Sequence, residues 1–216
     1  MGTSARRAFG WGRMALAGCV VLMPCGPAGA QTLPSGGSVA AGSASIIAID
    51  PAKTVIVQQS EKAVVNWQSF SVGAGASVAF QQPNSAAIIL NRVTGSGASI
   101  IDGNLLANGQ VWLINGNGIL MGQGSRIDVG GLIATTSDIA DKDFLSGRYD
   151  FTKSSANPDA AVINRGSIAA ATGGSAILSG AHVANEGVIQ AKLGRVVLGG
   201  LSRSGPHSCP DSFCRW

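Results

Sequence analysis

Residues 90–136 read LNRVTGSGASIIDGNLLANGQVWLINGNGILMGQGSRIDVGGLIATT. Short aliphatic runs alternate with corners made of glycine and asparagine, and no run is long enough, or polar enough on one side, for a surface helix. Glycine and asparagine adopt the backbone angles of tight turns that branched residues avoid. The stretch therefore predicts short β-strands joined by tight turns.

A five-residue pattern recurs along the chain: glycine, any residue, a small apolar residue, an apolar residue, leucine. Its copies are residues 109–113, 174–178 and 194–198. The last two copies begin 20 residues apart, and the first two begin 65 apart, close to three such periods. A second mark, asparagine-x-glycine-x-isoleucine, begins at Asn164 and again 21 residues later at Asn185. A period of this size indicates a repeat architecture in which each coil of chain lies on the one before it.

The repeat predicts an all-β fold, a β-helix with two or three strands in each coil. Alternate residues of a strand face opposite sides. The residues expected to point inward, stacked coil upon coil, are Val111 and Leu113, Ala176 and Leu178, and Val196 and Leu198. The alternative is a β-sandwich of ordinary hairpins, but tight hairpin turns give no reason for such a period.

The amino-terminal residues have the three parts of a signal peptide. A group of arginines precedes the apolar run Met14–Met23, and Ala28 and Ala30 stand before Gln31 as in a signal-peptidase site. The apolar run is shorter than the roughly 20 residues that span a bilayer. Leu16–Cys19 offers a second possibility, a lipoprotein cleavage box. Both interpretations predict export from the cytoplasm.

We divide the chain into a signal peptide (1–30), a β-helix domain (31–200) and an atypical tail (201–216). The tail combines arginine, proline, histidine, cysteine and tryptophan without any strand rhythm. Our hypothesis is that the reading frame is lost near Gly200, which would leave an out-of-frame tail or a truncated passenger.

Two parts of the domain depart from the regular repeat. The strand-like segments Ser45–Ile49, Thr54–Gln58, Ala63–Trp67 and Ser77–Phe80 are expected to form the opening turns. The first part of residues 31–80 is expected to cap the stack, because a solenoid otherwise ends in open strand edges. Residues 138–160 carry clustered charge and alternating aromatic residues. They predict a short turn and a hairpin packed outside the stack.

Charge and side-chain chemistry exclude several classes of function. The formal net charge of +4 comes from the two ends, because residues 31–200 contain ten basic and ten acidic residues. A domain without net charge gives no electrostatic reason to bind nucleic acid.

Some β-helices are polysaccharide lyases or hydrolases, which group carboxylates on one face. Here the acids are scattered, or gathered in 138–150 among basic residues. We predict no catalytic or metal site, no cofactor and no small-molecule substrate.

Six motifs occur in the order seen in one protein family. They are Asn66–Phe70, Val78–Pro83, Leu90–Val93, Gly103–Gly109, Asn115–Ile119 and Gly130–Thr136. With them, residues 33–200 resemble the filamentous haemagglutinin N-terminal domain, also called the haemagglutination activity or two-partner secretion domain. Residues 164–200 resemble the following coils of high-molecular-weight adhesins. The resemblance implies a right-handed parallel β-helix, in agreement with the repeat.

The resemblance also implies a function. The domain would be the secretion-targeting module of an adhesin-like exoprotein in a Gram-negative bacterium. A partner outer-membrane β-barrel of the TpsB type would recognise it through periplasmic POTRA domains and thread it outward. The β-helix would then form outside, in the medium or at the cell surface. The competing interpretation is direct adhesion, in which the domain itself binds the host-cell surface or glycans.

Two motifs matter for secretion in the resembled family. They correspond here to Asn91, Arg92 and Val93, and to Asn115, Gly116, Asn117, Gly118 and Ile119. Each also has a plainer interpretation: a strand that ends in a polar corner with its arginine on a neighbouring coil, and a simple turn. Gly116 stands where the family usually has proline. Proline would fix φ for a type I or type II turn, whereas glycine leaves the turn type open.

Overall fold

The structure is a computed structural model that describes residues 1–2 and 32–200. The predicted cleavage site at Ala28, Ala30 and Gln31 lies outside the described residues, and so does the predicted atypical tail. Within the described part of the chain, no helix has the length and apolar character needed to cross a membrane.

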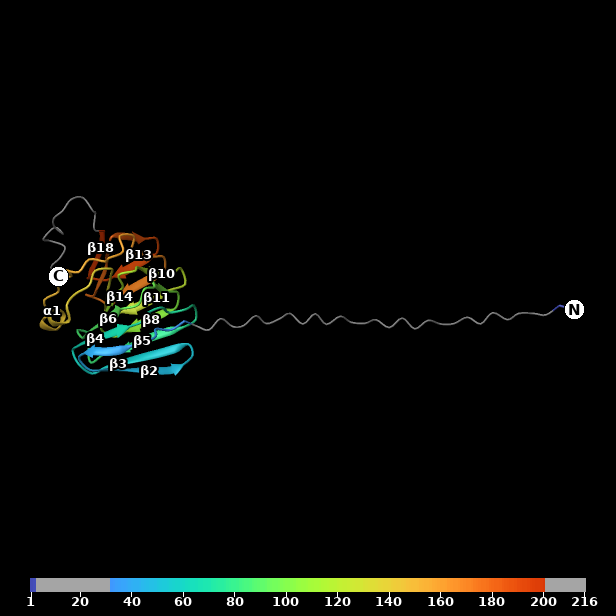
Figure 1. Cartoon of the computed structure of the whole chain (residues 1–216), viewed down its shortest axis with the longest axis horizontal. Helices are drawn as coiled ribbons and strands as arrows, with labels where there is room; N and C mark the ends of the chain where they lie inside the picture. The colour runs from blue at the N-terminus through green and yellow to red at the C-terminus, as the bar shows by residue number, and fades with distance from the viewer. Residues whose placement is uncertain (3–31, 201–216) are drawn as a thin grey trace.

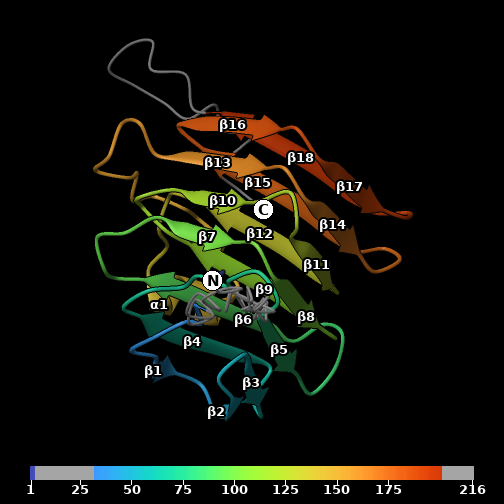
Figure 2. The same cartoon turned by 90° about the vertical axis from the view of Figure 1, so that its right-hand side faces the viewer.

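The described residues form three sheets wrapped around one axis, with one strand of each regular coil in each sheet (Figures 1 and 2). The first sheet contains, in spatial order, β1 (Ser38–Ala41), β4 (Lys62–Trp67), β6 (Ile88–Val93), β9 (Gln110–Ile114), β12 (Gly131–Thr135), β15 (Ser175–Gly180) and β18 (Arg195–Gly200). The second contains β7 (Ser99–Ile101), β10 (Ile119–Met121), β13 (Ala161–Asn164) and β16 (His182–Asn185). The third contains β2 (Ala44–Asp50), β3 (Lys53–Gln58), β5 (Ser77–Gln81), β8 (Asn104–Ala107), β11 (Arg126–Val129), β14 (Ser167–Ala170) and β17 (Val188–Ala191).

Successive coils are stacked in register, as the repeat predicts. Strands β9, β12, β15 and β18 pair in parallel, and this places Val111, Leu132, Ala176 and Val196 in one column. The third sheet forms a second column of Val78, Leu105, Ile127 and Ile168. The aliphatic members of these inner columns contribute roughly 1.5–3 kcal/mol each when fully buried. The prediction of a parallel β-helix is therefore confirmed.

The predicted inward positions are confirmed except at the last strand. Val111, Leu113, Ala176 and Leu178 are all buried. Val196 and Leu198 continue the same columns, but each is 47% exposed. Their predicted burial is wrong because they lie on β18, and no further described coil covers that strand (Figure 2).

The 65-residue spacing between two copies of the repeat covers two coils, so the predicted three periods are wrong. Val111 pairs with Leu132, which follows it by 21 residues. Leu132 pairs with Ala176, which follows it by 44 residues. The second coil is longer because residues 138–153 leave the stack before the chain returns to β13.

The repeated glycine allows close contact between coils. An added Cβ at Gly174 would lie 2.0 Å from the carbonyl oxygen of Gly130, and one at Gly194 would lie 1.6 Å from that of Gly174. Real Cβ atoms do not approach backbone oxygens so closely. Glycine at this corner thus lets each strand of the first sheet begin directly above the previous one.

The amino-terminal end is capped, as predicted. Strands β1 and β2 run antiparallel to β4 and β3, and so they end the parallel ladders of two sheets. All four strand-like opening segments fall within β2, β3, β4 and β5. The antiparallel cap covers strand edges that would otherwise offer free backbone donors and acceptors.

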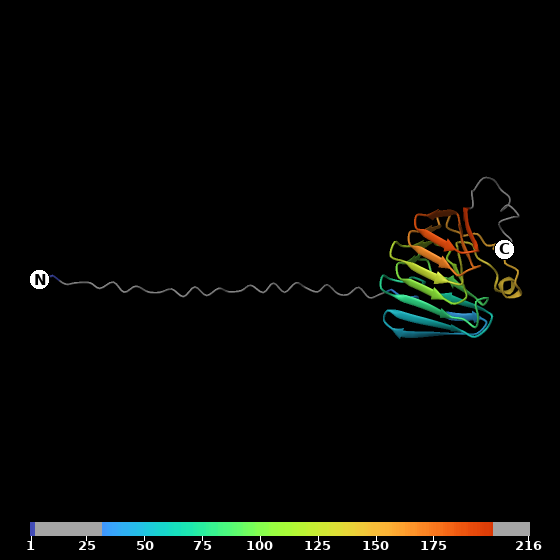
Figure 3. The same ribbon diagram turned by 180° about the vertical axis from the view of Figure 1, so that it is seen from behind.

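Residues 138–153, called the excursion below, pack outside the stack as predicted, but they do not form a hairpin of strands (Figure 3). An antiparallel bridge between Asp138 and Lys153 closes the ends. Between them lies a short helix, α1 (Asp141–Ser146), which ends at Gly147 in the left-handed conformation with φ 81°. Acidic residues in the first turn and glycine after the last turn both favour a helix here.

Candidate functional site

Asn91 lies on β6 with its side chain inside the β-helix and is 0% exposed. Its Oδ1 accepts a hydrogen bond of 3.0 Å from Nε1 of Trp67 on β4. Its Nδ2 donates to the carbonyl oxygen of Trp112 on β9 at 3.3 Å. A buried amide without such partners would be costly. Asn91 therefore connects three consecutive coils from within the core.

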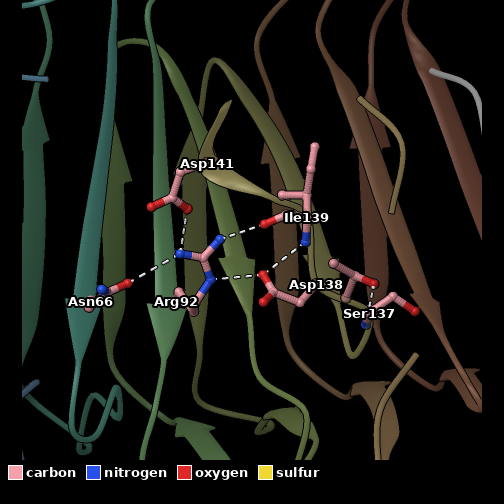
Figure 4. A network of polar contacts seen from close by, with 7 residues as sticks. Asn66, Arg92, Ser137, Asp138, Ile139 and Asp141 are labelled. Atoms are coloured by element: carbon pink, nitrogen blue, oxygen red, sulfur yellow. Dashed lines mark hydrogen bonds and ion pairs between the residues drawn. The ribbon is translucent and has the colours of Figure 1, made fainter. Parts of the chain in front are cut away.

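Arg92 points to the opposite face of β6, where its guanidinium is held by the excursion (Figure 4). Nε contacts Oδ1 of Asp138 at 2.8 Å, and Nη1 contacts Oδ1 of Asp141 at 2.7 Å. Nη2 donates to the carbonyl oxygen of Ile139 at 2.7 Å, and Nη1 donates to Oδ1 of Asn66 at 3.3 Å. The guanidinium thus joins two strands to one side of the excursion.

The charge of Arg92 is stabilised by these partners. Burial by itself would lower the pKa of Arg92, but hydrogen bonds and charge attraction from Asp138 and Asp141 outweigh it and raise the pKa above its ordinary value. Arg92 therefore stays charged throughout the physiological range.

The plainer interpretation, an arginine on a neighbouring coil, is too simple because most of its partners belong to the excursion. Val93 returns to the interior and is 8% exposed.

Asn115–Ile119 forms the corner between β9 and β10. The N–H of Gly118 donates to the carbonyl oxygen of Asn115 at 3.0 Å, which closes a four-residue turn. Among the described residues only Leu193 and six glycines have positive φ, and neither Gly116 nor Asn117 is one of them. A hydrogen-bonded turn with negative φ at both central positions is type I.

Hydrogen bonds connect the turn to the coil before it and to the chain that follows it in the stack. Nδ2 of Asn115 donates to the carbonyl oxygen of Gly97 and to Oγ of Ser99, each at 3.0 Å. Nδ2 of Asn117 donates to the carbonyl oxygen of Gly95 at 2.9 Å. On the other side, the Ser155 hydroxyl donates to the carbonyl oxygen of Gly116. The turn is therefore more than a simple corner.

The structure brings the two predicted motifs together. Arg92 on β6 is in register with Ile114 on β9, the residue before the turn. The motifs therefore occupy adjacent coils near the same corner of the stack. Their side chains are largely enclosed: Asn91 and Asn115 are 0% exposed and Ile119 is 2% exposed.

Sequence reasoning missed a second core on the outer face of the first sheet. Its buried members are Val64, Ile88, Leu90, Trp112, Ile114, Ile133, Ile139, Phe144 and Ile177. The signal was present, because Ala63–Val65 and Ile88–Leu90 are unbroken apolar runs. Such runs are typical of strands buried on both faces, whereas alternation indicates one buried face.

The side chains of the two motifs connect neighbouring coils. Over residues 32–200, no group of three or more His, Cys, Asp and Glu side chains is placed to hold a metal ion. Asp138 and Asp141, the two carboxylates that contact the first motif, form ion pairs with Arg92.

Comparison with known proteins gives a consistent result. A family model described as "TPS secretion domain" matches residues 30–204. A heme/hemopexin-binding protein of Haemophilus influenzae is 46% identical over 101 residues, which are 47% of this chain and 11% of that protein. Its counterpart in strain Rd is 44% identical over 112 residues, which are 52% of this chain and 12% of that protein. The chain thus matches only a small part of these relatives.

A solved structure has the same architecture. The crystal structure of the HMW1 secretion domain from Haemophilus influenzae aligns with a TM-score of 0.72 at 34% sequence identity. The alignment covers 77% of this chain and 44% of the HMW1 chain.

Proposed function

Because this chain belongs to the TPS secretion domain family, we propose that it directs secretion of an exoprotein and that its β-helix is completed outside the cell. The family model covers nearly all of the described residues. The observation that carries the proposal is the register of the coils, in which Val111, Leu132 and Ala176 form one buried column. Such a column gains stability with each coil that docks.

Secretion of this kind takes place in Gram-negative bacteria and uses a TpsB-type outer-membrane transporter. For this chain we propose passage through the periplasm and recognition there by the POTRA domains of the transporter. The product would be extracellular or associated with the cell surface.

Folding supplies a driving force for outward movement. No nucleotide is available outside the cell, so the free energy must come from a step beyond the pore. In a repeat stack each coil buries its apolar residues on the coil before it, and stability accumulates by nearest-neighbour contacts. A coil that has docked outside no longer returns through a narrow pore without losing those contacts.

The enclosed motif residues have a place in this mechanism. Asn91 and Asn115 are 0% exposed in the folded domain, so their side chains offer no surface to a transporter once the β-helix has closed. We propose that these two residues stabilise the folded stack. Any direct recognition of them by the transporter would take place before the β-helix closes. Arg92 also stabilises the folded stack, because it binds the excursion.

Co-expression with a cognate transporter tests the proposal. The full chain is expected in the culture medium only when the transporter is present, and in the periplasm when the transporter is absent. A transporter lacking its POTRA domains serves as the control and is expected to leave the chain in the periplasm. Equal amounts in the medium with and without the transporter would contradict the proposal.

The names of the two curated relatives describe binding of heme or hemopexin by whole proteins. The residues matched here make up 11% and 12% of those proteins. We assign neither that binding nor adhesion to any residue of this chain. We propose secretion as the function of the segment that this chain shares with the two relatives.

A further inference from the structure

In each of three successive coils, one outward-facing side chain makes a specific contact with the excursion. The residues are Lys62 on β4, Arg92 on β6 and Trp112 on β9, and each uses a different type of interaction. All three precede the excursion in the sequence. The excursion therefore packs against coils that come before it in the chain.

Lys62 holds the end of the short helix. Its Nζ donates to the carbonyl oxygens of Phe144 and Leu145, at 3.0 and 3.1 Å. These carbonyls belong to the last turn of α1, where a cation is favourable, and that of Phe144 also accepts a hydrogen bond from the N–H of Gly147. The same Nζ lies 5.1 Å from the centroid of the Tyr149 ring. Lys62 thus adds, from 82 residues away in the sequence, a cationic side chain to the left-handed cap that Gly147 already forms at the end of α1.

Arg92 holds the beginning of the excursion. It contacts Asp138, the carbonyl oxygen of Ile139 and Asp141, while Nη1 also reaches Asn66 on β4. Charge-assisted hydrogen bonds of this kind fix geometry more firmly than neutral ones. The beginning of the excursion and the last turn of its helix are therefore fastened to two neighbouring strands.

Trp112 anchors the middle of the excursion. Its ring lies edge-on to Phe144 and Tyr149, with centroids 5.3 and 4.7 Å away, and 5.8 Å from the ring of Phe151. Phe144 and Ile139 are 0% exposed. The aromatic group thus covers the outer face of the first sheet, where Val64 and Leu90 are also fully buried.

From these contacts we infer that residues 138–151 are a latch that makes β4, β6 and β9 open only as one unit. Contacts between coils otherwise join each coil to its neighbours, so an uncovered stack can open one coil at a time. The latch spans three coils at once and is complete only when residue 151 has joined the fold. The inference deepens the proposed function, because it identifies the point at which a partly exported stack becomes committed to its folded form.

Hydrogen exchange on the purified full chain, without any transporter, tests the latch. The double variant Asp138→Asn/Asp141→Asn removes the charges that face Arg92. We expect the amides of β4, β6 and β9 to exchange at least tenfold faster, and those of β14 and β17 to change less than twofold. The matched control is Arg165→Gln, which breaks the exposed ion pair with Glu186 and is expected to leave β4 and β6 unchanged.

A second variant keeps the inference testable if the double variant does not fold. Lys62→Met retains the apolar stem but loses both bonds to α1, and it is expected to give the same local acceleration. Equal acceleration in every strand, or unchanged exchange in β4 and β6 of a folded variant, would overturn the latch. The secretion proposal fails by a different result, namely wild-type chain that stays in the periplasm despite its transporter.

Discussion

Trp67 and Asn91 are joined inside the β-helix: the indole Nε1 donates to the amide Oδ1 at 3.0 Å, and the two side chains are 1% and 0% exposed. A residue of the first predicted motif thus has an internal partner one coil away. The arrangement gives a residue that was predicted to matter for secretion a definite role in the stability of the stack.

Replacing Asn91 by alanine should destabilise the fold. The change leaves Nε1 of Trp67 buried without its acceptor, which costs about 1–3 kcal/mol. The free energy of unfolding is expected to fall by this amount, and the midpoint of urea unfolding is expected to fall with it. Asn104→Ala, at a partly exposed position on β8, is the control and should have a much smaller effect. Equal midpoints for Asn91→Ala and the wild type would show that the buried bond does not contribute.

Gly116→Pro should be accepted by the turn. Gly116 occupies the second position of a type I turn, where proline is favoured, and its added Cβ has no neighbour closer than 3.7 Å. A compatible proline stabilises by about 0.4–1 kcal/mol through the unfolded chain. Thermal unfolding measures the difference.

The neighbouring glycine supplies the contrast for this experiment. Gly118 has φ +109°, and its added Cβ would lie 3.0 Å from the carbonyl oxygen of Ala161. Gly118→Ala should therefore lower the unfolding temperature while Gly116→Pro does not. The opposite order would refute the assignment of the turn type.

Gly174→Ala should disturb the stacking of coils. The new Cβ would lie 2.0 Å from the carbonyl oxygen of Gly130, and backbone cannot yield as a flexible side chain does. Overpacking of this kind typically costs about 1–3 kcal/mol. Gly97→Ala is the control because nothing lies within 4 Å of its added Cβ. Chemical unfolding of both variants would show no difference if close contact between coils were unimportant.

The contribution of Arg92 to stability should not vary between about pH 6 and pH 9. Its pKa is raised in the folded state, so its contribution is fully present below the unfolded pKa and is lost only as the pH rises through the folded value, in strong alkali. Arg92→Met should cost about 2 kcal/mol, between the values for surface and buried pairs. Urea unfolding of both proteins across this range measures the cost, and a loss confined to one end would contradict the assignment.

Local patterns in the sequence were enough to predict the stack itself. The repeat that begins at Gly109 and returns at Gly174 and Gly194 defines the corners of the first sheet, and the inward positions follow from the strand period. The type of turn at Gly116 could not be predicted, because glycine permits several turns.

The excursion was harder to predict, and the reasons are physical. Helix α1 has only six residues, too few to be stable by themselves, and its last turn is bound by Lys62, which lies 82 residues away from Phe144. Nothing in the residues near Phe144 indicates such a partner. The second core, in contrast, could have been found from the unbroken apolar run Ile88–Leu90.

The most direct test of the account is the ratio of chain in the medium to chain in the periplasm, measured for Val111→Asp in cells that carry the cognate transporter. Val111 is 0% exposed, whereas Val188, the matched control, is 53% exposed on β17. If folding of stacked coils drives secretion, the ratio falls severalfold for Val111→Asp and stays at the wild-type value for Val188→Asp. An unchanged ratio for Val111→Asp would contradict the claim that the β-helix powers its own export.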